Sequence, residues 1–314
     1  MSNVEISENN PVPVKASLKF IKFFKWFFLI GFLLVFFIWI QLPQIKINQY
    51  IQSEIKKAIA PYGIKFQAED ASLSLFFGVK YSMTNVELSF ENRTQKIVLD
   101  EVMFYPSLLK SLFGYQAAKI KWIQDDEDSS VYFSVKNQSF SLELDLNNLN
   151  LRKLGVFSYL YNLQGDGSVS AEGDIYGNLT DFTQLNGDVY INLNKLSLKK
   201  QSVLGFSIPA VLVSTGRAQL VSTNGKLSVK DLGLGGEKDD LFAKVTGDLN
   251  FSKRVRSSKL NLEAKFKFSD KIKKSFVLLN SLLRNALQKD GFYAYSIKGT
   301  LGSPRPSPLK TKRK

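Results

Sequence analysis

The longest hydrophobic run in the chain lies near its N-terminus. Residues 27–40 read FFLIGFLLVFFIWI and contain no polar side chain. Apolar residues dominate from residue 20 to residue 42, interrupted by two lysines and one glutamine, and Pro43 then ends the run. At about 1.5 Å per residue these positions reach roughly 35 Å as a helix, enough to cross a bilayer. The pattern predicts a transmembrane anchor over residues 20–43.

Two other interpretations fit this segment less well. A buried core helix would be amphipathic, whereas phenylalanines here occupy every helical face. A cleaved signal peptide needs small residues at its cleavage site, and the following QLPQIKINQ offers none. We therefore expect an uncleaved anchor. Its predicted membrane-embedded residues are Trp26, Phe27, Phe28, Leu29, Ile30, Phe32, Leu33, Leu34, Val35, Phe36, Phe37, Ile38, Trp39 and Ile40.

Four lysines precede the run and lie close to it, namely Lys15, Lys19, Lys22 and Lys25. Because positive charge collects on the cytosolic side of a membrane, we expect these lysines to set the topology, with the N-terminus in the cytosol. Residues 1–19 are predicted to be a disordered cytosolic tail. The rest is translocated, so in a bacterium with two membranes the anchor lies in the inner membrane and the large domain in the periplasm.

An amphipathic helix is predicted directly after the anchor, over residues 45–60. Isoleucine recurs there at every fourth position, at Ile47, Ile51, Ile55 and Ile59, with lysine and glutamate among the other positions. Such a stripe either lies on the membrane surface or packs under a following sheet, and we favour the sheet.

From residue 64 the hydrophobic period changes from four to two. Apolar and polar residues alternate over residues 79–83, 86–90, 120–122 and 140–146, and this pattern continues to about residue 268. Many short strands and few helical stretches predict a mainly β domain over residues 44–303. We expect an elongated, curved antiparallel sheet with one apolar face and repeated strand units.

Internal echoes support repeated strand units. LELDLNNLNL at 142–151 and VYINLNKLSL at 189–198 share one pattern, in which the apolar alternation slips by one residue. The slip turns the next apolar side chain to the other face unless a bulge or turn absorbs it. A Gly-Asp pair followed by an apolar residue recurs at 173–174, 187–188 and 247–248, and each pair is predicted to open a strand after a turn.

A C-terminal amphipathic helix follows the strands. Its apolar stripe is Ile272, Phe276, Leu279, Leu283 and Leu287. Ser269 or Asp270 is the expected N-cap, and Gly291 lies just beyond the end. A last strand is predicted over residues 292–301.

Residues 304–314 are predicted to be a basic, proline-rich tail, because its prolines exclude a helix or a central strand. Lys310, Lys312, Arg313 and Lys314 are either solvated or contact an anionic membrane surface. The net charge of +14 favours anionic partners, but no basic patch is interleaved with aromatics, so we expect no nucleic-acid partner.

The chain has no cysteine and no histidine. These absences exclude Ser-His-Asp triads, Cys-His dyads and ordinary zinc sites. The acidic cluster at residues 125–128 fits a solvated turn better than a cation site. GLGG at 233–236 fits a tight turn better than a phosphate cradle. We therefore expect no catalytic residue, no metal and no cofactor, and predict that the chain is not an enzyme.

The order of these elements, with GDGSVSAEGDIYGNLTDFTQLNGDVYINLNKLSL at 165–198 and YSIKGTLGSPRPSP at 295–308, resembles the AsmA-like superfamily. Within it, the chain looks most like the type II secretion system protein N (GspN) group. The resemblance covers residues 20–308 and rests on strand and turn motifs without a catalytic signature. It implies an inner-membrane anchor and a periplasmic β domain that serves a secretion machine or envelope lipids.

Two functions from different classes follow. The first, which the resemblance to the GspN group favours over the second, is a non-enzymatic interaction or assembly component of type II protein secretion, docked through sheet edges or the tail. The second is lipid binding or transfer between membranes, with acyl chains, such as those of phospholipids, held in an apolar β trough. The two differ in whether the apolar face is sealed as a core or keeps an open strip.

Overall fold

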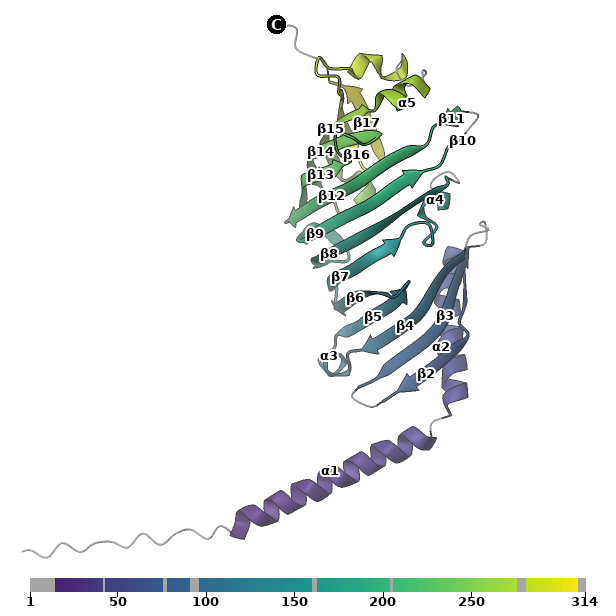
Figure 1. Ribbon diagram of the computed structural model, residues 1–314. Helices are drawn as coiled ribbons and strands as arrows, with labels where there is room; N and C mark the ends of the chain where they lie inside the picture. Colours follow the sequence, from purple (N-terminus) through teal and green to yellow (C-terminus); the bar gives the residue numbers. More distant parts are fainter. Residues whose placement is uncertain are drawn as a thin grey trace, which may run out of the picture. The chain divides into compact units, whose positions relative to one another are not determined.

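The computed structural model describes residues 15–41, 43–75, 78–90, 96–159, 163–203, 206–275 and 281–309 (Figure 1). The chain divides after Tyr50 into two compact units. The first unit holds α1 (Lys15–Gln41) and the start of α2, and the second holds the rest of α2 and the sheet.

α1 is a 27-residue helix that contains the predicted anchor residues 26–40. Its start corrects the predicted disordered tail, because residues 15–19 are already helical. The sequence KASLK supplies lysine, alanine and leucine, which favour a helix. Residues 1–14 of that tail lie outside the described residues. Within the described chain, no helix meets the combined length and hydropathy that a membrane crossing requires.

The predicted anchor residues are largely exposed where their side chains are described. Every side chain from Phe23 to Leu34 is exposed, Phe36 is half-buried, and Phe37 is exposed. The side chains of Val35, Ile38, Trp39 and Ile40 lie outside the described residues, as do those of the topology lysines Lys15, Lys19 and Lys22.

The predicted amphipathic helix is confirmed as α2 (Gln44–Ile59). It ends in a 3₁₀ turn, η1 (Ala60–Tyr62), which Gly63 closes in the left-handed conformation at φ 68°. Ile51, Ile55 and Ile59 pack against a buried cluster of strand residues formed by Phe66, Tyr81, Met83 and Val86. The isoleucine stripe of the second unit therefore packs against the sheet, as favoured from the sequence.

The second unit is built on one 15-stranded antiparallel sheet, which confirms the mainly β prediction. Strands follow each other in nearly their sequence order from β1 to β17, as Figure 1 shows for the middle of the sheet. β1 and β2 both pair with β3, and β10 and β11 form a separate hairpin. The sheet strands are β1 (Ile64–Gln67), β2 (Asp70–Ser74), β3 (Lys80–Phe90), β4 (Lys96–Pro106), β5 (Gln116–Gln124), β6 (Glu127–Lys136), β7 (Ser139–Asn150), β8 (Gly165–Asn178), β9 (Asp181–Leu198), β12 (Val211–Thr223), β13 (Lys226–Leu234), β14 (Leu241–Asn250), β15 (Lys259–Phe268), β16 (Tyr293–Thr300) and β17 (Ser303–Pro308).

The connections carry the remaining elements. They are α3 (Leu108–Leu112), α4 (Val156–Tyr159), β10 (Gln201–Val203), β11 (Phe206–Ile208), η2 (Val255–Ser257), α5 (Asp270–Ser275) and η3 (Arg284–Ala286).

Bulges absorb the slip in the repeated strand pattern. The register shifts between Leu146 and Leu149 where β7 pairs with β8, and again where β8 pairs with β9. Asn148 and Lys195, at equivalent places in the two echoes, have φ of 45° and 51°. Each residue uses the left-handed region to return the chain to register, so the apolar side chains stay on one face.

The prediction that each Gly-Asp pair opens a strand is wrong. Gly173, Gly187 and Gly247 lie inside β8, β9 and β14. Their φ values are 151°, 140° and 128°, and a side chain has no room there, because a Cβ would lie 2.0–2.2 Å from a carbonyl oxygen of a neighbouring strand. The repeated glycine marks a place where two strands approach each other closely. In sequence, a glycine of this kind looks the same as one in a turn.

The C-terminal helix is confirmed only in part. α5 begins as expected, with the Ser269 hydroxyl accepting the Ile272 N–H at 3.4 Å, and Ile272 is buried. Phe276 and Leu279 lie outside the described residues. Leu287 does not continue the stripe, because it bridges to Tyr293 in extended conformation and is 49 % exposed.

The predicted tail also needs correction, since Ser303–Pro308 form an edge strand, β17. The N–H of Leu309 donates to the Ala294 carbonyl, so the odd-numbered residues face β16. Pro304, Pro306 and Pro308 therefore turn their backbone nitrogens away from the sheet, where no hydrogen bond is lost. Lys310, Lys312, Arg313 and Lys314 lie outside the described residues.

Candidate functional site

The two faces of the sheet differ sharply in chemistry. In β9, Val189, Ile191 and Leu193 are half-buried on one face, whereas Tyr190 and Asn192 are exposed on the other. Because neighbouring strands pair in register, the same division continues from strand to strand. The register therefore converts a short alternation in each strand into two continuous surfaces.

One uninterrupted line of apolar or glycine residues crosses the whole sheet, which we call the apolar row. Its members are directly paired residues of consecutive strands. They are Leu73, Tyr81, Phe104, Ile120, Val131, Leu144, Gly173, Val189, Leu220, Val229, Gly247, Leu262, Ile297 and Pro306. At about 4.8 Å per strand the row extends for roughly 60 Å.

The adjacent line on the opposite face is polar from β5 to β13. It runs through Lys121, Ser130, Asp145, Glu172, Tyr190, Gln219 and Asp231. A sheet with one solvated and one apolar face requires something to cover the apolar one.

Protein covers the apolar row mainly at its two ends. At the N-terminal end, α2 packs on the cluster that contains Tyr81, with Leu73 and Phe104 beside it. At the other end, Tyr293 stacks on Phe266 with ring centroids 5.6 Å apart, and Tyr293 is 3 % exposed. η3 and α5 contact β16 and β15 there.

The middle of the row has no such cover among the described elements. From β7 to β14 the main contacts of each strand are with its neighbours in the sheet. Among the described helices, α4 packs its buried Phe157 against Gly165 at the start of β8. Val131, Leu144, Val189 and Leu220 accordingly stay half-buried. Val229, farther along the row, is 8 % exposed. The stretch of the row from Val131 to Leu220 is therefore partly accessible and can accept aliphatic chains by apolar burial.

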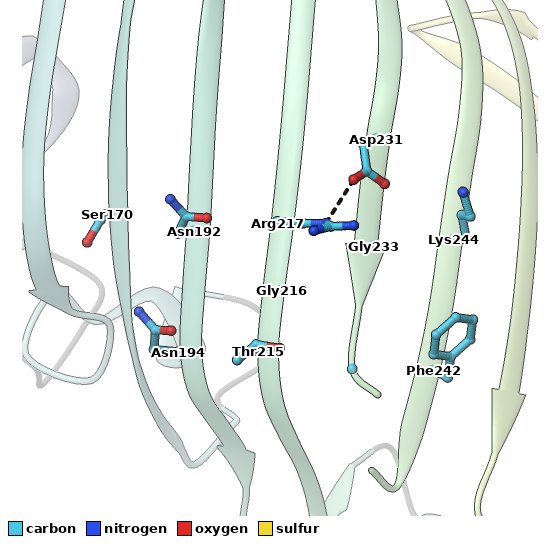
Figure 2. A pocket seen from close by; sticks show the side chains of 11 residues that line it. Ser170, Asn192, Asn194, Thr215, Gly216, Arg217, Asp231, Gly233, Phe242 and Lys244 are labelled. Atoms are coloured by element: carbon cyan, nitrogen blue, oxygen red, sulfur yellow. Dashed lines mark ion pairs between the residues drawn. The ribbon is translucent and has the colours of Figure 1, made fainter. Parts of the chain in front are cut away.

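A hollow of about 590 Å³ lies across β8 to β14 and is lined mainly by polar-face residues (Figure 2). Asn192, Arg217, Gly233 and Lys244 are aligned across four strands. Gly233 lacks a side chain in the middle of this line, and a Cβ there would meet nothing within 4 Å. The missing side chain contributes to the hollow.

The charges of the hollow are only partly balanced. The Arg217 Nε lies 2.8 Å from an Asp231 carboxylate oxygen, as Figure 2 shows, while Lys244 lies on the next strand beside Phe242. Exposed cations and amides of this kind suit an anionic or hydroxylated group. The hollow contains no pair of groups placed for proton transfer or nucleophilic attack among the residues that line it.

The acidic cluster at residues 125–128 contains a turn, as expected, formed by Asp125 and Asp126, and its last two residues begin β6. Asp125 and Asp126 both have positive φ, of 57° and 65°, which is typical of a two-residue hairpin turn. Asp125 and Asp128 pair with Lys153 and Lys121. In the part of the chain that the structure describes, no group of three or more acidic side chains is arranged to hold a metal ion.

GLGG at 233–236 likewise ends a strand and forms a turn. Gly235 is left-handed at φ 76°, and the Gly236 N–H donates to the Asp239 carboxylate at 2.7 Å. The burial of Asp239 pushes its pKa upward, but hydrogen bonds from Ser214 and Gly236 outweigh burial and hold the pKa below its ordinary value. The glycines serve the turn.

The site residues expected from the sequence do not belong to the sheet. The anchor residues and the four lysines all lie in α1, and the four basic residues of the C-terminus lie outside the described residues. The sequence predicted an apolar face but not the apolar row, because the row depends on the pairing register of every strand.

Comparisons with protein-family models, curated proteins and solved structures found no match to this chain.

Proposed function

We propose that this protein is a non-enzymatic, membrane-anchored module that holds the acyl chains of lipids along the apolar row. The observation that carries the proposal is the partly exposed stretch of that row from Val131 to Leu220. A single-layer sheet that leaves such a strip partly exposed is stabilised when aliphatic chains cover the strip, by about 0.8 kcal/mol per buried methylene. A phospholipid supplies such chains.

α1 is proposed to be the membrane anchor, with the N-terminus in the cytosol and the sheet in the periplasm. Support comes from the exposed apolar side chains between Trp26 and Leu34, a stretch that contains no charged residue. Lysines on the N-terminal side of this stretch support the orientation.

The predicted role in type II secretion, and with it the resemblance to the GspN group, stays a prediction. One route to it, strand addition at the C-terminal edge of the sheet, is disfavoured. Pro304, Pro306 and Pro308 offer no N–H group to an incoming strand on the outer side of β17.

The test is to produce residues 44–314 in the periplasm, purify them without detergent, and quantify bound lipid by mass spectrometry. This fragment keeps α2 whole and includes the complete sheet. We expect near-stoichiometric phospholipid. A lipid-free, monodisperse fragment would contradict the proposal and direct attention to crosslinking against secretion components.

A matched pair of variants locates the lipid. Ile191→Asp places a charge on the apolar face, whereas Asn192→Asp places the same charge on the polar face one residue away. We expect Ile191→Asp to lose most of the bound lipid, because a carboxylate in contact with acyl chains is costly to desolvate. Asn192→Asp should retain the lipid. Equal lipid in both folded variants would show that the apolar face does not hold it.

A further inference from the structure

The connection between β4 and β5 exposes an unusual group of large apolar side chains. It contains α3, and we call residues 107–115 the α3 tip. Leu108, Leu109, Leu112 and Phe113 are 55 %, 75 %, 81 % and 72 % exposed. Single exposed leucines are ordinary, but four large apolar residues within six positions form a patch that marks an interaction surface.

The α3 tip is ordered by its backbone and not by its apolar side chains. The Ser107 N–H donates to the Ala117 carbonyl at 2.8 Å, and the Tyr115 N–H donates to the Lys110 carbonyl at 3.0 Å. Gly114, left-handed at φ 77°, closes the turn. The fold of the tip therefore holds the apolar side chains outward without using them in a core.

Lysine and tyrosine side chains surround the base of the tip. Lys110 Nζ lies 4.8 Å from the centroid of the Tyr132 ring, and Lys136 Nζ lies 4.4 Å from that of Tyr115. The hydrogen bond from Lys110 to Tyr132 raises the pKa of the lysine, so it stays charged. At a membrane interface, apolar side chains contact acyl chains, while lysine and tyrosine side chains lie at the level of the head groups. The α3 tip, with lysines and tyrosines at its base, has the same order.

We propose that the α3 tip inserts into the interface of a lipid bilayer that contains anionic head groups. The leucines and Phe113 enter the acyl boundary, and Lys110 and Lys136 contact phosphates. A protein partner is the less favoured occupant, because the two lysines complement an anionic lipid surface. This contact is separate from the apolar row and does not depend on lipid held there.

The experiment uses the absence of cysteine from the chain. Leu112→Cys in the full-length protein takes a single environment-sensitive fluorophore, and Glu237→Cys, in an exposed loop between β13 and β14, is the control. Both are reconstituted in vesicles of phosphatidylethanolamine and phosphatidylglycerol. Quenchers attached to lipid acyl chains are compared with aqueous iodide.

We expect lipid-attached quenchers to remove most of the emission at position 112 and little at position 237, with iodide giving the opposite order. Leu108→Ser with Leu109→Ser should abolish the difference at position 112. The control Leu212→Ser, at another exposed leucine, should preserve it. Unchanged melting temperatures identify the variants that remain folded.

Equal iodide access at positions 112 and 237 in these vesicles would overturn the proposal. A photoreactive residue at position 112 extends the test to cells. Crosslinks to lipid support the assignment, whereas crosslinks to one protein would replace the bilayer with a protein partner.

Discussion

At the residue scale, Gly173 and Gly187 let β8 and β9 approach each other more closely than side chains allow. A Cβ on Gly173 would lie 2.1 Å from the Asp188 carbonyl oxygen, and a Cβ on Gly187 would lie 2.0 Å from that of Asp174. The two glycines meet reciprocal partners, so both strands need them. A backbone carbonyl within a sheet cannot move aside cheaply.

Gly173→Ala is therefore expected to lower the free energy of unfolding by about 2 kcal/mol or more. Urea unfolding of residues 44–314 measures the loss. Gly233→Ala is the matched control, because its Cβ enters open space in the hollow. The control should change stability by less than about 0.5 kcal/mol. Equal losses in the two variants would contradict the close approach.

Asp240 is the second residue on which local structure depends. Its side chain is 11 % exposed and accepts hydrogen bonds from the Ser269 hydroxyl, the Lys271 ammonium and the Leu212 N–H. Burial pushes the pKa of Asp240 upward, but these hydrogen bonds outweigh it, and the net pKa lies below the ordinary value of 3.8. The carboxylate thereby ties β12 to the start of α5.

The pKa of Asp240 is lower in the folded than in the unfolded chain. The ionised carboxylate therefore stabilises the fold at pH values above its ordinary pKa, and this stabilisation is lost as the pH falls through the pKa of the folded state. Asp240→Asn should lower the free energy of unfolding at pH 7 by about 1–3 kcal/mol. The difference in free energy of unfolding between Asp240→Asn and the parent chain should become smaller at pH values below 3.8. Asp270→Asn, at an 86 % exposed carboxylate, should show little change. A difference independent of pH would contradict the role of the charge.

At the element scale, β17 shows how the end of a long sheet avoids further pairing. An edge strand normally presents N–H groups that another strand can use. Proline at every second position of β17 removes these donors from the outer side and leaves the pairing with β16 intact. The spacing of the prolines, and not their number alone, makes this strand possible.

Replacing Pro304, Pro306 and Pro308 by threonine restores the outward N–H groups. We expect residues 44–314 with these changes to self-associate, because the edges of two copies can then pair. Size-exclusion chromatography with light scattering measures the mass. Threonine at Ser303, Arg305 and Ser307, which face β16, is the control and should leave the association state of the parent fragment unchanged. No increase in mass for the proline variant would contradict this role.

Elements with a strong period were predictable, and those fixed by pairing were not. The isoleucine stripe of α2 and the alternation in β7 and β9 are visible in the sequence because apolar residues repeat at a fixed spacing. The proline edge of β17 was predicted as a tail, since its hydrogen bonds come from β16. α3 was missed because a five-residue helix with exposed leucines carries no amphipathic signal.

At the scale of the whole molecule, the sequence predicted a large antiparallel sheet with one apolar face, and the structure has a 15-stranded sheet of this kind beside the β10–β11 hairpin. The sequence did not show which apolar residues of neighbouring strands lie side by side on that face. Leu144 and Val189 belong to one line only because β7, β8 and β9 pair in a particular register, which shifts at three places along these two pairings. The candidate site thus depends on the pairing register of many consecutive strands and not on the pattern within one strand.

The nearly sequential order of the strands has a consequence for how the chain acquires its structure. A strand in this sheet pairs with strands that directly precede and follow it in the chain, apart from β1 and the β10–β11 hairpin. A chain delivered from its N-terminus can therefore add each new strand to a sheet that already exists. The loop to be closed stays short at every step, so folding can keep pace with delivery, and only the edge formed by the newest strand waits for a partner.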